Sequence, residues 1–199
     1  RWSAAGGLVI PGLVDCHTHL AFGGWRADEF EARLLGHSYQ DIAARGGGIL
    51  STVTQTRAAA PGALLTRCRH HLTEIARLGV TTVEAKSGYG LSLDHELALL
   101  DIYRQLELDG QQRIVATLLA AHVVPPEFRD RRAAYVELVI EEIIPAAAAR
   151  GLARFCDVFV ESGAFTIEEA RAILQAGLAH GLRPKLHADQ LSGGGGAEL

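Results

Sequence analysis

Short apolar runs alternate with segments of helical period along the chain. Each run is rich in Val, Ile and Leu, and each is followed by a segment in which apolar residues recur every three or four positions. This alternation is typical of a parallel sheet wrapped by helices, so the predicted fold class is α/β. Five strands are predicted, at residues 8–16, 80–86, 113–121, 156–161 and 183–188.

Two of the intervening helices have clear sequence signals. Thr166 and Glu169 match a capping box, and Gly181 is placed to end the helix that this box begins. The apolar face of that helix is predicted to hold Ala170, Ile173, Leu174 and Gly177. An earlier helix is predicted to end before Gly79 and to bury one stripe, formed by Leu64, Cys68, Leu72 and Ile75.

The stretch at residues 23–61 is longer than an ordinary connection between a strand and a helix. It carries helical patterns of its own, around residues 28–35 and 39–44. We interpret this stretch as an elaborated loop that covers the mouth of a barrel.

Two α/β architectures are compatible with the predicted strand-helix units. Five units in about 190 residues fit a TIM-type (β/α)8 barrel of about 250 residues cut short, so residues 1–199 are expected to form its N-terminal part. A doubly wound sheet is the alternative. Side chains capable of chemistry stand at the C-terminal end of nearly every predicted strand, where a barrel builds its site, and this favours the barrel.

Composition narrows the class of protein. The 199 residues are 48% apolar with a formal net charge of −4, which indicates a soluble globular protein with one sizeable core. Without a basic excess, nucleic acid is not an expected partner, and without an apolar run of roughly 20 residues, neither is a membrane. Cys16, Cys68 and Cys156 have apolar neighbours and are expected to be buried free thiols, which indicates a reducing, cytoplasmic location.

Three histidines are candidate metal ligands. His17 and His19 end the first predicted strand, and because alternate residues of a strand point to the same face, both imidazoles can reach one ion. His187 closes the fifth predicted strand and supplies a third nitrogen for zinc or iron, which leaves a coordination position for water. A purely structural role for each histidine stays open at this point.

Four further side chains are candidates for substrate contact. His122 ends the third predicted strand, and Tyr89 stands between glycines after the second. Gln190 lies just after the fifth, and Arg26 lies on the long loop, where its planar guanidinium could bind a carboxylate. Each could instead be solvated or bonded only to backbone. Glu161 ends the fourth predicted strand, and a role facing the site and a salt-bridge role both stay open.

Several stretches together resemble a known family. Residues 11–19, Pro-Gly-Leu-Val-Asp-Cys-His-Thr-His, resemble the strand-one signature of the amidohydrolase superfamily. Within that superfamily, four stretches resemble the imidazolonepropionases, at residues 46–49, 84–90, 120–122 and 185–191. The resemblance spans the whole chain, and the set is more specific than any of its members.

The resemblance implies a metal-dependent barrel enzyme. Its reaction is the hydrolysis of the cyclic amide bond of 4-imidazolone-5-propanoate to N-formimidoyl-L-glutamate, in histidine degradation. It implies three ligands for one zinc or iron ion, His17, His19 and His187. It implies four substrate contacts, of which the last two are also assigned to catalysis: Arg26, Tyr89, His122 and Gln190. A general-base aspartate that completes the metal ligands, and a histidine on strand six, are expected beyond Leu199.

Two other functions remain open from the sequence. Another mononuclear amidohydrolase, such as a cytosine or guanine deaminase, would use the first-strand histidines equally well. A catalytically inactive barrel could serve as a binding module. A small-molecule substrate is the expected partner, and a homodimer is left open. Residues 1–199 alone are expected to be inactive and to associate, because a partial barrel exposes unpaired strand edges.

Overall fold

The computed structural model describes residues 3–38, 41–42 and 46–199. The strands are β1 (Leu13–Thr18), β2 (Val80–Lys86), β3 (Arg113–Ala121), β4 (Phe155–Val160) and β5 (Arg183–Ala188). The α-helices are α1 (Ala27–Leu34), α3 (Ile49–Ala58), α4 (Pro61–Arg77), α5 (Leu93–Asp109), α6 (Arg132–Leu138), α7 (Ile144–Ala149) and α8 (Ile167–Ala179). The shorter helical segments are η1 (Pro126–Phe128), η2 (Val139–Ile143) and η3 (Gly196–Glu198).

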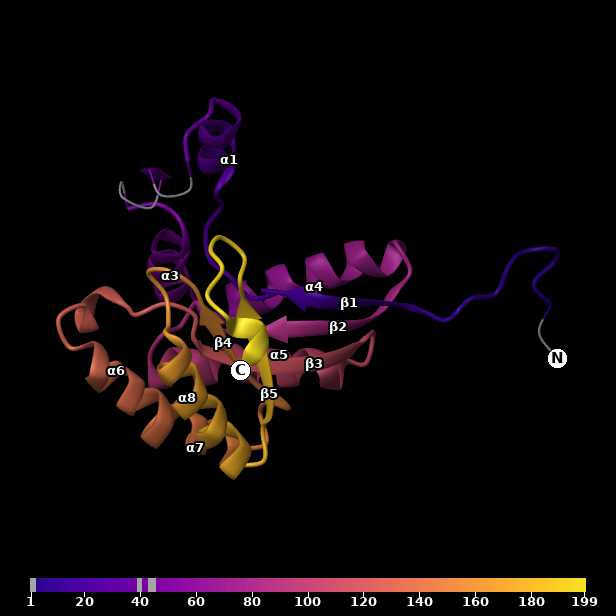
Figure 1. Cartoon of the computed structure of the whole chain (residues 1–199). Coiled ribbons are helices and arrows are strands. Elements are labelled where there is room, and N and C mark those ends of the chain that lie inside the picture. Colours follow the sequence, from indigo (N-terminus) through magenta and orange to yellow (C-terminus); the bar gives the residue numbers. More distant parts are fainter. Residues whose placement is uncertain (1–2, 39–40, 43–45) are drawn as a thin grey trace.

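The predicted strands all form, and two of them differ in their bounds from the prediction. β2, β3 and β5 have the predicted bounds, and β4 is shifted by one residue. The first strand begins at Leu13, so its predicted start at residue 8 is wrong. Its pairing with β2 starts with Leu13 opposite Val80, and Pro11 has no N–H to extend the ladder. The apolar residues before Pro11 are therefore left exposed, in an extended segment that leads away from the sheet (Figure 1).

The strand order confirms an α/β fold and argues against the doubly wound alternative. All neighbouring strands are parallel, and the order in the sheet is β1-β2-β3-β4-β5. A doubly wound sheet reverses its direction of growth at a switch point, and no reversal occurs among these strands. The sheet curls as each strand is added, and Figure 1 shows all the strands in this one layer.

Helices cover the sheet along apolar stripes. α4 packs against β2 and α5, α5 packs against β3, and α8 packs against β4 and β5. The predicted stripe of α4 is confirmed, with Leu64, Cys68 and Leu72 buried and Ile75 partly buried. α8 begins at the predicted capping box, in which the Thr166 side chain accepts from the Glu169 N–H and the Glu169 carboxylate accepts from the Thr166 N–H.

The stretch at residues 23–61 contains two described helices. α1 matches the pattern predicted around residues 28–35, and it stands away from the sheet (Figure 1). The helix predicted at residues 39–44 lies mostly outside the described residues. α3 was not predicted, because its sequence is rich in Ser and Thr and its apolar residues do not form a clear stripe.

Two of the three cysteine predictions are confirmed and one is wrong. Cys68 and Cys156 are buried free thiols, and burial raises the pKa of each to about 12. Cys16 is exposed, because β1 is an edge strand of the described sheet and pairs on one side only. None of the helices in the described part of the chain is long and apolar enough to cross a membrane.

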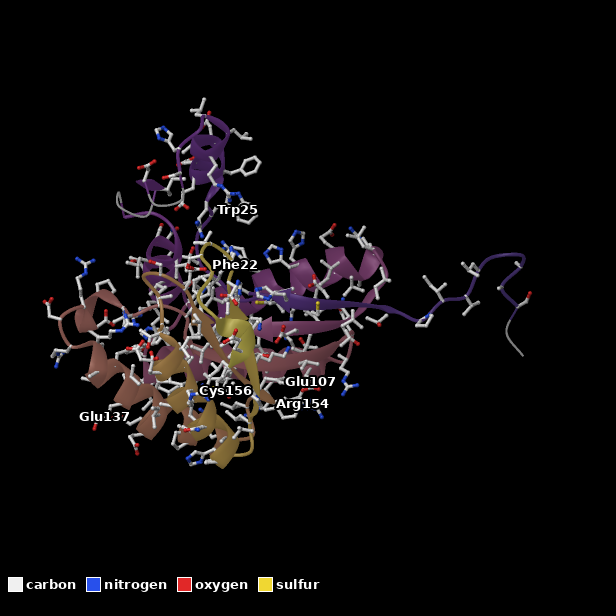
Figure 2. All side chains as sticks on the ribbon, in the orientation of Figure 1. Phe22, Trp25, Glu107, Glu137, Arg154 and Cys156 are labelled. Atoms are coloured by element: carbon white, nitrogen blue, oxygen red, sulfur yellow. The ribbon has the colours of Figure 1, made fainter. Side chains whose placement is uncertain are left out.

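A substitution at the contact between α8 and β4 tests this packing. A Cβ at Gly177 would lie 2.8 Å from Cβ of Cys156, a residue of β4 that Figure 2 labels, so Gly177→Ala is expected to push the helix away from the sheet. We expect the substitution to lower the free energy of unfolding by about 1–3 kcal/mol, despite the higher helix propensity of alanine. Urea denaturation measures this change.

Gly62 in α4 is the matched control. A Cβ there meets no atom within 4 Å, so Gly62→Ala is expected to be neutral or to stabilise the protein by up to about 1 kcal/mol. Equal effects of the two substitutions would contradict the close packing of α8 on β4.

Candidate functional site

The C-terminal ends of the strands bring polar side chains to one end of the sheet. His17 lies near the end of β1, Lys86 ends β2, His122 follows β3, Glu161 follows β4, and His187 lies near the end of β5. This convergence is a direct result of parallel pairing, which places the carboxyl ends of neighbouring strands at the same edge.

Aromatic rings connect the predicted site residues in a continuous row. The His19 ring stacks on that of His122, with centroids 4.8 Å apart and planes inclined by 13°. The Tyr89 ring lies 4.8 Å from His19 and 5.3 Å from His122. Phe159 of β4 continues the row, 6.0 Å from His122 and 4.8 Å from His187. The structure therefore brings together side chains from all five strand ends or the loops that follow them.

Backbone carbonyls determine which nitrogen of two histidines carries the proton. Nδ1 of His19 lies 2.9 Å from the carbonyl oxygen of Ser87, and Nδ1 of His122 lies 2.9 Å from that of Gly88. A carbonyl oxygen only accepts hydrogen bonds, so each Nδ1 must donate. In the neutral rings Nε2 then carries the lone pair, and this is the atom available to an ion or to a substrate N–H.

Burial keeps both of these rings neutral. Desolvation lowers the pKa of His122 to about 4, against the opposing effect of its hydrogen bond to Gly88. Desolvation, together with the nearby His122 and His17 rings, holds the pKa of His19 well below its ordinary value. Partial burial and the charge of Lys86 also lower the pKa of His17. Neutral imidazole is the form that binds metal ions.

The His17 ring lies near the rings of the two other predicted metal ligands. The ring centroid of His17 lies 6.1 Å from that of His19 and 5.1 Å from that of His187. Zinc–nitrogen bonds of about 2.0–2.1 Å put two imidazole centroids about 5 Å apart on a tetrahedral ion. The described residues contain no group of three His, Cys, Asp or Glu side chains already arranged to hold a metal. The three histidines therefore resemble a metal site in residue type, tautomer and approximate spacing.

Gln190 contacts the third of these histidines directly. Its Oε1 is hydrogen-bonded to Nε2 of His187, so binding an ion through that nitrogen requires Gln190 to turn away. The loop that carries Gln190 is held by Glu161, whose carboxylate accepts from the N–H groups of Leu191 and Ser192. The hydrogen bond from the Ser192 hydroxyl, together with these N–H groups, lowers the pKa of Glu161 to about 2. Glu161 therefore anchors the loop after β5.

Arg26 and Tyr89 lie on a second part of the site. With His19 they line a cavity of about 520 Å³. Phe22 and Trp25 also line this cavity, and Figure 2 labels both on the segment that leads from β1 to α1. His17 and His187 instead line a neighbouring hollow of about 380 Å³, so the predicted residues are divided between two adjoining spaces.

The Arg26 guanidinium already has one acidic partner. Its Nε and Nη2 both lie 2.6 Å from Oε2 of Glu29, while Oε1 of Glu29 accepts from the Gly48 N–H. The ion pair thus ties Arg26 to the Gly46–Gly48 segment of the loop. Because a guanidinium has five N–H donors, donors remain for a ligand carboxylate.

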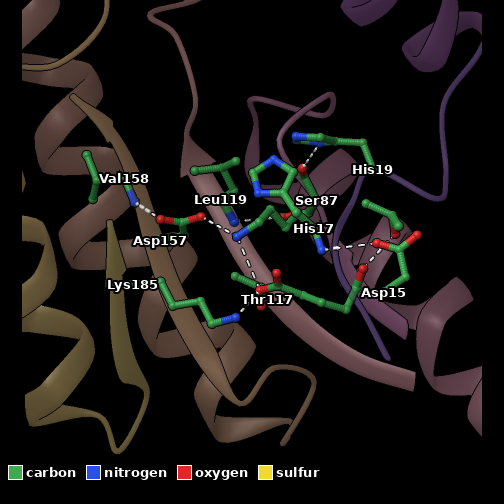
Figure 3. A network of polar contacts seen from close by, with 12 residues as sticks. Asp15, His17, His19, Ser87, Thr117, Leu119, Asp157, Val158 and Lys185 are labelled. Carbon is green, nitrogen blue, oxygen red and sulfur yellow. Dashed lines mark hydrogen bonds and ion pairs between the residues drawn. The ribbon is translucent and has the colours of Figure 1, made fainter. Parts of the chain in front are cut away.

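A buried ion-pair network lies beneath His17 and His187. Nζ of Lys86 lies 2.5 Å from Asp157 Oδ2 and 3.2 Å from Glu84 Oε1, and all three side chains are at most 5% exposed. Nζ of Lys185 lies 2.5 Å from Glu84 Oε1, and the Thr117 hydroxyl donates to the same oxygen. Figure 3 shows Asp157 and Lys185 reaching into this network, with the His17 ring beside it.

The network keeps the Glu84 carboxylate charged. Burial alone would raise the pKa of Glu84, but hydrogen bonds from Lys185 and Thr117 and the charge of Lys86 hold it below the ordinary value. The network thus joins β2, β4 and β5 through charged side chains, and β3 through the Thr117 hydroxyl.

Neither the network nor Phe159 was predicted from the sequence, although the sequence contains features that indicate both. Asp157 interrupts the apolar run Phe-Cys-Asp-Val-Phe-Val, and a charge in a buried strand requires a partner. Glu84 and Lys86 are two residues apart, so they share one face of β2. Phe159 shares the face of Asp157 by the same rule.

Comparison with known proteins supplies the remaining evidence on identity. The chain is 54% identical over 197 residues to an imidazolonepropionase of Symbiobacterium thermophilum. The matched region covers 98% of this chain and 46% of the relative. Over 196 residues it is 54% identical to one of Myxococcus xanthus, with 98% of this chain and 47% of the relative covered. The resemblance to the imidazolonepropionases is confirmed.

A third imidazolonepropionase, from Erwinia tasmaniensis, is 50% identical over 199 residues and matches 100% of this chain and 49% of its own length. The chain therefore spans about half the length of the curated imidazolonepropionases that it matches. No family model matches the chain.

The hydrogen bonds of the two stacked histidines predict their tautomers. In the metal-free protein at pH 7, His19 and His122 are expected to be neutral with the proton on Nδ1. The ¹⁵N chemical shifts of labelled histidine check this. Protonation of His122 is expected near pH 4, and a proton on Nε2 of either ring at pH 7 would contradict the geometry.

Removal of Lys86 tests the buried network. Lys86→Met leaves Asp157 without its cationic partner in a buried position, and we expect a loss of about 3–5 kcal/mol in the free energy of unfolding. Arg77→Met, which breaks an exposed pair with Glu74, is expected to change it by less than about 0.5 kcal/mol. A similarly small effect of Lys86→Met in urea denaturation would refute the structural role of the network.

Proposed function

We propose that residues 1–199 form the N-terminal part of a TIM-type barrel of the amidohydrolase superfamily. The parallel strands in sequential order and the polar residues at their C-terminal ends support this proposal. The relatives are about twice as long as the chain, which leaves room for three more strand-helix units. In this proposal residues 23–61 cover the mouth of the barrel.

The proposed reaction is the hydrolysis of the cyclic amide C–N bond of 4-imidazolone-5-propanoate, which gives N-formimidoyl-L-glutamate in histidine degradation. The observation that carries this proposal is the 50–54% identity to imidazolonepropionases over nearly the whole chain. The neutral histidines at the strand ends support it, since they are suited to a metal-dependent hydrolase.

We assign His17, His19 and His187 as ligands of one zinc or iron ion. The neutral state of His19 and its unprotonated Nε2 support this assignment, as do the short distances from the His17 ring to the rings of His19 and His187. When bound, such an ion would act as a Lewis acid and would lower the pKa of a bound water towards about 7. A carboxylate beyond residue 199 is expected to complete the ligand set.

The substrate residues follow from the cavity and the row of rings. The free donors of Arg26 bind the propionate carboxylate of the substrate, and the Tyr89 ring packs beside the imidazolone ring. His122, neutral at pH 7, accepts an N–H of that ring through Nε2. Gln190 is released from His187 and uses its amide to hold the substrate carbonyl in place.

Metal content and turnover of the full-length protein test this proposal. We expect about one zinc or iron ion per chain by elemental analysis, and loss of the absorbance of 4-imidazolone-5-propanoate. Arg26→Ala is expected to raise KM about tenfold to a hundredfold with bound metal retained, because a hydrogen-bonded charge pair is lost. His187→Ala is expected to remove the metal.

Two exposed residues provide controls. Arg33→Ala, on the same helix region as Arg26, and His180→Ala, at the end of α8, are expected to leave both measurements unchanged. Full metal content in His187→Ala would refute the ligand assignment. Bound metal without turnover would favour a deaminase substrate, and neither metal nor turnover would favour a non-enzymatic binding module.

A further inference from the structure

Glu96 is a fully buried carboxylate in the first turn of α5. Its side chain is 0% exposed. Oε1 accepts from the N–H groups of Gly90 and Leu91 at 2.8 Å and from Gly88 at 3.1 Å, and Oε2 also lies 3.1 Å from the Gly88 nitrogen. The carboxylate is therefore enclosed by the backbone of the loop at residues 87–91.

Backbone donors compensate this charge. No ion pair includes Glu96 in the part of the chain that the structure describes, although burial of an unpaired carboxylate is costly. Burial raises its pKa, against the opposing hydrogen bonds from Ser87 and from the loop N–H groups. A carboxylate kept in such a position at this cost indicates that the conformation of the loop is what it secures.

The loop has a backbone that needs this support. Gly88 has φ of +101°, and Leu91 has φ of +51°, which is unusual for a residue with a side chain. A Cβ at Gly90 would lie 2.6 Å from the backbone nitrogen of Glu96 and 2.8 Å from Oε1, so the loop lies directly on the start of α5. Glu96 thus selects one conformation of a strained segment.

The same loop supplies three elements of the candidate site. Its Ser87 carbonyl accepts from Nδ1 of His19, its Gly88 carbonyl accepts from Nδ1 of His122, and its Tyr89 ring packs against both imidazoles. Movement of the loop would therefore disturb all three side chains together.

We propose that Glu96 is a positioning residue, which fixes the loop at residues 87–91 and through it the tautomers of His19 and His122 and the place of Tyr89. Its effect on catalysis rests on the proposed function, whereas its effect on the histidines does not. Glu96 touches neither substrate nor ion and acts only through the loop.

Glu96→Gln in the full-length protein tests this inference. The amide keeps the size of the side chain, but its NH2 group cannot accept from the loop N–H groups. We expect kcat/KM for 4-imidazolone-5-propanoate to fall about tenfold to a hundredfold, the range typical for residues that orient a site from behind. In the metal-free protein, the ¹⁵N signals of His19 and His122 are expected to shift towards a mixture of tautomers.

Gly90→Ala provides a second route to the same change, because the added Cβ separates the loop from an intact Glu96. It is expected to give the same histidine shifts and the same direction of change in kcat/KM, and it serves if Glu96→Gln does not fold. Leu106→Ala, buried in α5 ten residues beyond Glu96, is the control for simple destabilisation and is expected to leave the histidine signals unchanged.

Unchanged histidine signals in a folded variant with a disrupted Glu96 contact would overturn the inference, whether or not activity falls. Wild-type kcat/KM in such a variant would also overturn it. If the wild-type protein itself fails to turn over 4-imidazolone-5-propanoate, the proposed function fails, and the histidine signals still decide the role of Glu96.

Discussion

The ammonium group of Lys86 lies between carboxylates from two different strands, and the shape of the candidate site depends on this contact. Lys86 of β2 reaches Asp157 of β4 inside the curl of the sheet, and Lys185 of β5 reaches Glu84 of β2. Charges taken out of water are stable only when their partners are close and well oriented. The distances between these strands are thereby restrained, and with them the separation of His17 and His187 at the strand ends.

Above this network, the backbone of one loop orients the rings. The carbonyls that follow β2 accept from His19 and His122, and these bonds leave Nε2 of both rings without a proton. A similar arrangement holds the loop after β5, where Glu161 accepts from the N–H groups of Leu191 and Ser192. In both cases a buried carboxylate fixes a loop, and the loop fixes the side chains that face the cavity.

Much of this organisation could be predicted from the sequence. Apolar runs gave the bounds of β2, β3 and β5, and because parallel strands end at the same edge, the placement of His17, His122 and His187 near one another followed. The start of β1 could not be predicted, since the run before Pro11 looks like a strand but pairs with none of the described strands. An apolar run indicates a strand only where a partner is available.

The contacts that orient the site could not be read from the sequence. The partner of a histidine Nδ1 is a backbone carbonyl, which is present at every position and carries no sequence signal. Glu96 has the pattern of an ordinary residue near the start of a helix, and only the folded chain places the loop N–H groups around it. Asp157 is different, because a charge in an apolar strand was visible in the sequence and required a partner.

In the proposed function, the strand ends build a histidine metal site whose ligand atoms are set by the loop after β2. A crystal structure of the metal-loaded, full-length protein, with anomalous data at the zinc or iron edge, tests it most directly. The account predicts one anomalous peak bonded to nitrogen atoms of His17, His19 and His187, with His19 bound through Nε2. A peak elsewhere, or His19 bound through Nδ1, would contradict it.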